Sequence, residues 1–225
     1  MRRKPYPPGS DRASRTRGWL EEIQDAVAPR PGLRIDPPRC ALLVIDMQRY
    51  FADPRGRCYL PATDDAIPGI RALLDAWRGI GGAVVFTQHA HEGRHDLGML
   101  GKFFSDHIRA GEPDAEIIRA LAPAPGEPVL RKTTYDAFRE TPLESILAEH
   151  GCTQVLVTGV LTHMCCETTA RSAFCRGFEV YVAADATASN SEERHIGSLL
   201  AMADCVAIVM SVEEIRERCG PRRSL

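Results

Sequence analysis

Three residues of reactive type follow apolar, strand-like stretches of this 225-residue chain. Asp46 closes the run LLVI, Lys132 follows the run VL, and Cys165 lies just past the run VLVT. A carboxylate can take the proton of a thiol, while an ammonium group holds the carboxylate and favours the thiolate. Taken singly, Asp46 and Lys132 also fit an ordinary buried ion pair. Together with Cys165 they favour a site in which a thiol acts as a nucleophile.

The segment VLVTGVLTHMCCETTARSAFCRGFEVYVAAD, residues 155–185, carries that thiol on a turn between a strand and a helix. The apolar run ends at Gly159, and a short turn brings Cys165 into the first turn of the expected helix. Exposed N–H groups at a helix start favour a thiolate. The same turn can supply backbone donors for a developing oxyanion.

Several neighbours of this thiol leave alternatives open. Cys165 and Cys166 are adjacent, so only one can face a cleft, and spacing alone does not separate them. Thr162 can cap the helix by accepting a backbone N–H. His163 is a second candidate base, although a hydrogen bond that orders the loop is the more common role for such a histidine.

A second group of polar residues follows the run AVVFT. His89, His91 and His95, with Asp96, form an H-x-H-x3-H-D pattern. First-row transition metals use such ligands, but this spacing on a loop is weak evidence, and we expect solvated or substrate-facing histidines. No glycine-rich phosphate loop occurs, so neither ATP nor a nicotinamide cofactor is implied.

Apolar runs alternate with helical spacing along the chain. The expected strands are Ala41–Ile45, Ala83–Thr87, Pro128–Leu130, Val155–Thr158, Phe178–Ala183 and Val206–Met210. The expected helices are Asp64–Ile80, Asp114–Leu121, Pro142–His150, Cys165–Arg176, Ser191–Met202 and Val212–Arg218. Continuously apolar strands separated by helices predict an α/β fold, a doubly wound, mostly parallel six-stranded sheet with helices on both faces in three layers.

In such a sheet, ligands bind outside the carboxyl ends of the strands. This rule brings Asp46, Gln88 with His89, Lys132 and Cys165 to one edge. The longest irregular stretch, residues 88–113, is long enough to be a lid or a binding loop.

Composition limits the remaining classes. The formal net charge is −2 and the hydrophobic fraction 44%, so no nucleic acid or membrane partner is indicated. Eight cysteines show no CxxC pair, no apolar run reaches a membrane span, and no secretory signal is visible, which predicts a reducing, cytoplasmic location. The first 17 residues hold six basic residues and one acid, and we expect a loose terminal arm.

Three motifs occur in the order typical of a known family. ALLVIDMQRYF, VLRKTTYDAF and TGVLTHMCCETTARSAFCRGFEVYVAADATAS resemble the isochorismatase-like hydrolase superfamily, over about residues 38–215. The resemblance implies a Cys–Asp–Lys triad of Cys165, Asp46 and Lys132, and it selects Cys165 over Cys166. It also implies a cis peptide at Val160–Leu161, with the N–H groups of Leu161 and Cys165 as oxyanion donors.

The resemblance points to two chemistries. Amide-cleaving members, such as nicotinamidases and N-carbamoylsarcosine or ureidoacrylate amidohydrolases, use the cysteine. Isochorismatases resemble this chain in DMQRYF, in DAFRETPLES and in the histidine of the turn, but they lack that cysteine and protonate a vinyl ether from the aspartate. Thr162 matches the cysteine-using pattern. Nicotinamidases hold a metal through a D-x-H pattern, whereas Asp53 has no histidine two residues on.

The sequence therefore predicts a hydrolase without cofactor or metal that cleaves an amide, carbamoyl or ureido C–N bond of a small metabolite through a thioester. A vinyl-ether hydrolase with Asp46 as general acid is the first alternative, and a catalytically silent metabolite- or partner-binding member is the second. We expect a homo-oligomer, an N-terminal arm with a short helix over residues 1–37, a hydrolase domain over 38–218 and a tail over 219–225. The substrate-binding candidates, chosen by position near strand ends, are Tyr50, Phe51, Gln88, Arg94, Tyr135 and His163.

Overall fold

A computed structural model of the chain describes residues 11–219, and its centre is one parallel sheet. The strands are β1 (Cys40–Ile45), β2 (Val84–His89), β3 (Val129–Lys132), β4 (Gln154–Val160), β5 (Glu179–Ala188) and β6 (Ile208–Met210). They lie in the order β3-β2-β1-β4-β5-β6, and every neighbouring pair is parallel. The order reverses between β1 and β4, as doubly wound folds require. The predicted fold class is confirmed.

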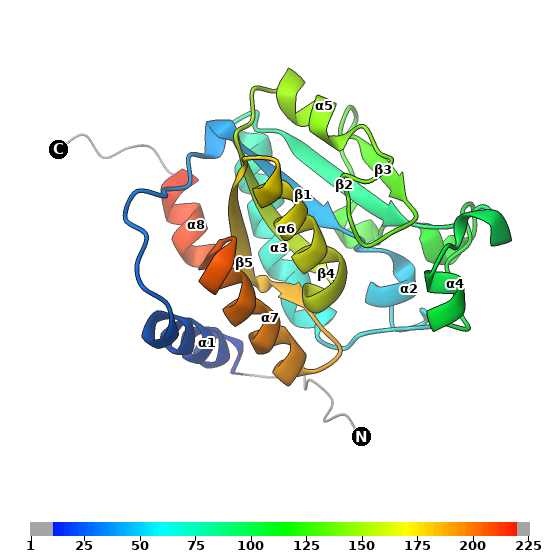
Figure 1. Cartoon of the computed structure of the whole chain (residues 1–225), viewed down its shortest axis with the longest axis horizontal. Helices are drawn as coiled ribbons and strands as arrows, with labels where there is room; N and C mark the ends of the chain where they lie inside the picture. Colours follow the sequence, from blue (N-terminus) through cyan, green and yellow to red (C-terminus); the bar gives the residue numbers. More distant parts are fainter. Residues whose placement is uncertain (1–10, 220–225) are drawn as a thin grey trace.

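Helices cover both faces of the sheet (Figure 1). Those described are α1 (Arg12–Ala26), α2 (Arg49–Ala52), α3 (Thr63–Gly79), α4 (Leu100–Phe103), α5 (Leu143–Glu149), α6 (Glu167–Cys175), α7 (Glu192–Cys205) and α8 (Val212–Cys219). Short 3-10 turns span Pro37–Arg39, Arg94–Asp96, Pro113–Ala115 and Arg119–Leu121. Within the described range no helix is long and apolar enough to cross a membrane.

The central strand shows why the sheet is buried on both sides. All six residues of β1 are buried, and they alternate between two apolar clusters. Leu42 and Val44 pack with residues of α3 and α8, whereas Leu43 and Ile45 pack with residues of α5, α6 and α7. A continuous apolar run is therefore needed here, because neither face of the strand meets water.

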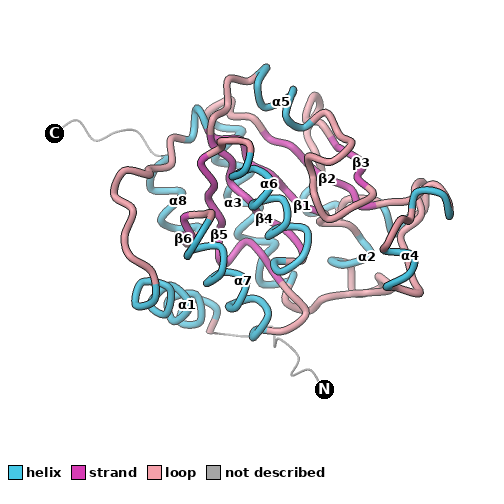
Figure 2. Tube along the Cα trace, in the orientation of Figure 1, coloured by secondary structure: helices cyan, strands magenta, loops and turns pink. Residues whose placement is uncertain are grey.

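One predicted helix is wrong. Residues 114–121 form two short 3-10 turns joined by extended backbone instead of a helix. In Figure 2, loop backbone (pink) surrounds the short helix α4 in the same connection between β2 and β3. The amide of Arg49 donates to the Glu116 carbonyl at 2.8 Å, and the amide of Ile118 donates to the Met47 carbonyl at 3.0 Å. Because these backbone groups pair with the segment after β1, they are not available for helical hydrogen bonds.

Within the described part of the N-terminal arm, Arg12–Ala26 form the packed helix α1. Trp19 and Ile23 of α1 are buried, the indole of Trp19 donates to Glu192 at 3.1 Å, and Arg15 forms an ion pair with Asp65 at 2.6 Å. These contacts fasten α1 to α7 and α3. The first ten residues of the predicted arm, and residues 220–225 of the predicted tail, lie outside the described range.

Gly159 ends the regular part of β4 at a place where only glycine fits. Its φ is +103°, and a Cβ there would lie 2.0 Å from the carbonyl oxygen of Ile45 on β1. We expect Gly159→Ala to destabilise the fold by about 3 kcal/mol or more, since backbone strain and a backbone clash act together. Denaturant unfolding measures the change.

Gly177 supplies the matched control for that substitution. Its φ is +86°, but an added Cβ would meet open space. Gly177→Ala should therefore cost only about 1 kcal/mol, from the left-handed conformation alone. Equal losses for the two variants would show that the close approach to β1 has no energetic weight.

Candidate active site

Asp46 lies directly after β1 and is held rigidly. Its backbone adopts φ of +50°, and its side chain has no exposed surface. The hydroxyl of Thr87 on β2 donates to Oδ1 at 2.6 Å, and the amide of Asp46 donates to the same hydroxyl oxygen at 3.1 Å. The carboxylate is thereby aimed along the carboxyl edge of the sheet.

Lys132, the last residue of β3, brings an ammonium group to this carboxylate. Nζ lies 2.7 Å from Oδ2 of Asp46 and 3.2 Å from Sγ of Cys165, and it donates to the Thr134 carbonyl at 3.0 Å. Burial opposes the charge, but Asp46 and Cys165 hold the pKa of Lys132 above its ordinary value. Burial alone would raise the pKa of the Asp46 carboxyl group, but the nearby Lys132 and His89 outweigh burial and lower this pKa below its ordinary value. Both groups are therefore charged at neutral pH.

Cys165 lies on a π-helical turn, Thr162–Cys166, between β4 and α6. The predicted helix start at Cys165 is thus replaced by a wider turn that begins three residues earlier. The side chain is only 6% exposed, and burial raises the pKa of the thiol to about 12 although Lys132 acts in the opposite direction. A thiol with so high a pKa is protonated at neutral pH and reacts as a nucleophile only after a base takes its proton, and Asp46 is the adjacent carboxylate.

Hydrogen bonds to Leu161, directly after β4, and to α7 hold the turn in place. The peptide between Val160 and Leu161 is cis, and the Leu161 carbonyl accepts the amides of Met164 at 3.0 Å and Cys166 at 3.3 Å. The hydroxyl of Thr162 lies 2.8 Å from Nδ1 of the buried His195 instead of capping the helix. Contacts with α7 therefore replace the helix cap that the sequence suggested for Thr162.

The two adjacent cysteines point in different directions. Sγ of Cys166 has no exposed surface, packs in the apolar cluster under α5, α6 and α7, and lies 3.9 Å from the Thr158 carbonyl. Cys165 instead meets Lys132. The structure thus places Cys165, and not Cys166, beside the charged pair.

The predicted substrate-binding residues divide into two groups. Near the thiol, Tyr135 is partly buried, and burial raises the pKa of its phenol. His163 lies on the same turn as Cys165, with Nδ1 2.7 Å from the Ser189 hydroxyl, a contact that matches the loop-ordering role.

Four other candidates have side chains that are engaged elsewhere or exposed. Gln88 donates its side-chain amide to the Ala115 carbonyl, and the hydroxyl of Tyr50 donates to Asp106 at 3.0 Å. Phe51 packs edge-on against Tyr50, and Arg94 is exposed. These contacts give none of the four a direct link to the three reactive side chains.

Sequence reasoning missed two polar residues that shape the site. Thr87 holds Asp46, and Gln48 bonds the amide and the carbonyl of His89, at 2.8 and 3.0 Å, and the Ala115 carbonyl at 3.1 Å. The period of two along a strand places Thr87 and His89 on one face of β2 and Gln88 on the other. That alternation was the available signal.

Neither of the two candidate metal-ligand sets has surroundings that fit a cation. Asp46, His89 and Cys165 offer ligand atoms within 4.8 Å of one another, but the ammonium of Lys132 already lies against all three. Asp53, the aspartate expected for a nicotinamidase-type metal, is engaged by Arg55 at 3.1 Å and Arg49 at 3.6 Å. The residues of these two sets therefore do not fit a metal ion.

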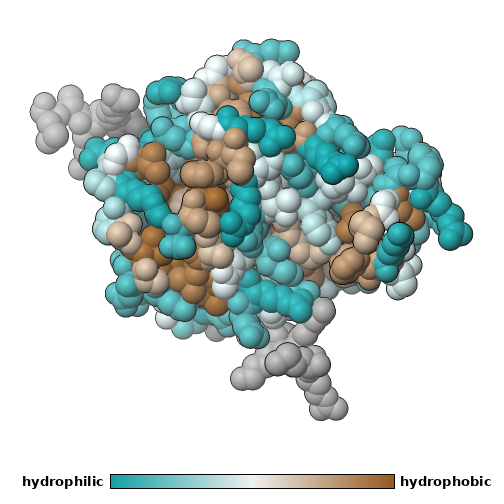
Figure 3. All heavy atoms as spheres, in the orientation of Figure 1, coloured by the Kyte–Doolittle hydropathy of each residue, from teal (hydrophilic) through white to brown (hydrophobic). Residues whose placement is uncertain are grey.

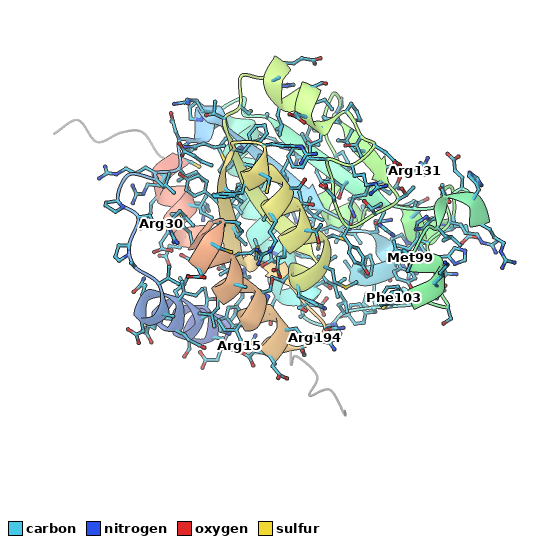
Figure 4. The ribbon with its side chains drawn as sticks, viewed as in Figure 1. Arg15, Arg30, Met99, Phe103, Arg131 and Arg194 are labelled. Carbon is cyan, nitrogen blue, oxygen red and sulfur yellow. The ribbon has the colours of Figure 1, made fainter. Side chains whose placement is uncertain are left out.

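Figure 1 shows α2 and α4 beyond the carboxyl ends of β2 and β3. In Figure 4, Met99 and Phe103 project from this part of the molecule, and their exposed fractions are 61% and 76%. Brown surface at the same place in Figure 3 marks the apolar character of this segment. The long loop predicted from the sequence, residues 88–113, thus carries exposed apolar side chains beside the sheet edge.

A thiol, a carboxylate and an ammonium group lie together at the carboxyl edge of a parallel sheet, and the comparisons with known proteins identify the class of protein as a hydrolase. Residues 40–214 match the Isochorismatase domain, so the chain belongs to the isochorismatase family. It is 38% identical to nicotinamidase 3 of Arabidopsis thaliana over 180 residues, which are 78% of this chain and 86% of that protein.

Two further comparisons add relatives with other names. An isochorismatase of Bacillus subtilis is 33% identical over 178 residues, covering 78% of this chain and 57% of that protein. The crystal structure of a cysteine hydrolase from Pseudomonas syringae superposes with a TM-score of 0.80 at 29% identity, covering 83% of this chain and 95% of that chain. The predicted family is confirmed.

Proposed function

We propose that this protein hydrolyses an amide, carbamoyl or ureido C–N bond of a small metabolite through a thioester on Cys165. The observation that carries the proposal is the contact of the Cys165 thiol with a buried ion pair, Lys132 Nζ at 3.2 Å and Asp46 within 4.8 Å. Vinyl-ether protonation needs an acid but no thiol, so this contact favours C–N cleavage.

The first half of the reaction forms the thioester. Asp46 takes the proton of the Cys165 thiol, and the sulfur attacks the substrate carbonyl carbon. The carbonyl oxygen becomes an oxyanion, for which we assign the backbone N–H groups of Leu161 and Cys165 as donors. The protonated Asp46 then gives its proton to the leaving nitrogen, and the C–N bond breaks.

The second half returns the enzyme to its starting state. Water attacks the thioester carbon while Asp46 takes one water proton, and the tetrahedral intermediate expels the thiolate. The proton on Asp46 returns to sulfur, so that the acid product and the original thiol remain. Lys132 keeps its charge throughout and stabilises each negative group that forms beside it.

The similarity to a nicotinamidase supports C–N cleavage, and the similarity to an isochorismatase supports the alternative. In the alternative, Asp46 in its acid form protonates a vinyl ether and Cys165 takes no part. That role requires Asp46 to be protonated, whereas Lys132 lowers the pKa of this carboxyl against the effect of burial. The electrostatics of the site therefore favour the base role.

A product assay on a mixed substrate panel separates the two reactions. The panel contains nicotinamide, N-carbamoyl and ureido acids, and isochorismate, and each is tested with wild type, Cys165→Ala and Asp46→Asn. We expect ammonia or amine release by wild type and by neither variant. Cleavage of isochorismate that persists in Cys165→Ala and is lost in Asp46→Asn would establish the vinyl-ether reaction instead.

A further inference from the structure

The ammonium group of Lys132 has more acceptors than hydrogens. A lysine donates three hydrogen bonds. Nζ lies 2.7 Å from Asp46 Oδ2, 3.0 Å from the Thr134 oxygen, 3.2 Å from Cys165 Sγ and 3.4 Å from Nδ1 of His89. The contacts with Thr134, Cys165 and His89 have hydrogen-bond geometry, and the contact with Asp46 is an ion pair. Because the carboxylate at 2.7 Å competes for one hydrogen, the sulfur and the imidazole share the hydrogen that remains beside the Thr134 bond.

A chain of contacts determines which nitrogen of His89 carries its proton. Nδ1 of His91 faces two oxygens of Asp96, the carbonyl at 3.1 Å and the carboxylate at 3.5 Å, and must therefore be the protonated nitrogen. Nε2 of His91 then has a lone pair, and it lies 3.2 Å from Nε2 of His89. His89 must donate across that contact, which leaves a lone pair on Nδ1 directed at Lys132.

Both imidazoles are neutral, as this arrangement requires. Burial and the adjacent Lys132 lower the pKa of His89 to about 3, and burial also lowers the pKa of His91. Asp96 is itself held by the amides of Glu92 at 2.9 Å and Gly93 at 3.3 Å. Asp96 on the surface loop thus sets the tautomer of His91, and His91 sets the tautomer of His89.

We propose that His89 is a positioning residue that takes the third N–H of Lys132 whenever the sulfur of Cys165 is acylated. This inference rests on the proposed thioester. The thiol sulfur is a weak acceptor, and a thioester sulfur is weaker still because a lone pair is delocalised into the carbonyl, so acylation would leave that N–H without a partner. The hydrogen bond moves from Sγ to Nδ1 on acylation and back on release of the product. The buried ammonium therefore keeps three partners in both states.

A double-mutant cycle on protein stability measures this redundancy without a substrate. Cys165→Ala removes the sulfur acceptor, and His89→Leu removes the nitrogen acceptor at similar volume. Either variant leaves one acceptor, whereas the double variant leaves a buried N–H unmatched. Each single variant raises the unfolding equilibrium constant by some factor. We expect the factor for the double variant to exceed the product of the two single factors by about tenfold or more.

Two further variants distinguish this role from general packing. His89→Asn retains an acceptor. When it is combined with Cys165→Ala, the logarithm of the excess in the unfolding equilibrium constant should be less than half of that for His89→Leu with Cys165→Ala. His91→Phe frees His89 to turn an Nδ1–H toward the Thr134 carbonyl, which also lies near that ring. His91→Phe combined with Cys165→Ala should therefore show the same excess in the unfolding equilibrium constant as His89→Leu combined with Cys165→Ala.

Additive effects within a factor of two in the Cys165→Ala and His89→Leu cycle would overturn the inference. That outcome is distinct from failure of the proposed function, which is scored by turnover in Cys165→Ala. With an identified substrate, His89→Leu should also lower kcat by about tenfold, and His89→Asn should restore at least part of this loss. An unchanged kcat in His89→Leu would count against the shift of the hydrogen bond during turnover.

Discussion

Replacing Cys165 with alanine is expected to lower kcat/KM for the amide substrate by about 10⁴-fold or more, since loss of a nucleophile removes the covalent route. The fold should persist, because the side chain lost is small and Lys132 keeps three other acceptors within 3.4 Å. Steady-state kinetics, with circular dichroism to verify folding, provide the measurement. Turnover within tenfold of wild type would exclude sulfur as the nucleophile.

Cys166 gives this experiment a control of identical chemistry on the same turn. Its side chain packs in the core and has no exposed surface. Cys166→Ala should cost about 1 kcal/mol of stability through lost packing but retain kcat/KM within about tenfold. A loss as large as that of Cys165→Ala would mean that the turn, and not the thiol, is what both variants disturb.

Replacing Lys132 with methionine is expected to destabilise the protein by about 3–5 kcal/mol, because it leaves the fully buried Asp46 carboxylate without its cation. Activity should also be lost, since Asp46 would become protonated and could no longer act as a base. Denaturant unfolding at neutral pH measures the stability change.

The pH dependence of this destabilisation has a definite sign. In wild type, the lowered pKa of Asp46 gives stability that is present above about pH 4 and lost below it, and the raised pKa of Lys132 gives stability that is lost only above about pH 10. In Lys132→Met the Asp46 pKa instead rises. The deficit of the variant should therefore shrink as the pH falls from 8 to 5.

The double variant Asp46→Leu with Lys132→Met is the control for this pair. Because both charges are absent, it should be more stable than Lys132→Met alone although it is inactive. A double variant less stable than either single variant would show that the side chains matter through shape and not through charge.

Much of the site could be predicted because parallel strands end at one edge. Asp46, His89, Lys132 and Cys165 each follow an apolar run, and the rule that ligands bind beyond the strand ends selects all four. The structure brings the other three within hydrogen-bond or ion-pair range of Lys132. Spacing alone could not choose between Cys165 and Cys166, because the choice depends on the π-helical turn.

The remaining features depend on tertiary contacts that no local pattern records. Residues 116–118 have helical spacing but pair with the segment after β1. The tautomer of His89 depends on Asp96, which lies on a loop whose conformation follows from ion pairs with Arg131 at 3.2 Å and contacts with His91. The packing of α1 depends on the indole of Trp19 meeting α7.

The most direct test of the central claim is mass spectrometry of the enzyme quenched in acid during turnover of its amide substrate. We expect a peptide that contains Cys165 to gain the mass of the acyl group, minus the one hydrogen that the thiol loses, and the adduct to disappear after hydroxylamine treatment. The same protocol on Cys165→Ala should give no adduct. Substrate consumption at the full rate with unmodified Cys165 at every quench time, and undiminished turnover by Cys165→Ala, would contradict the thioester account.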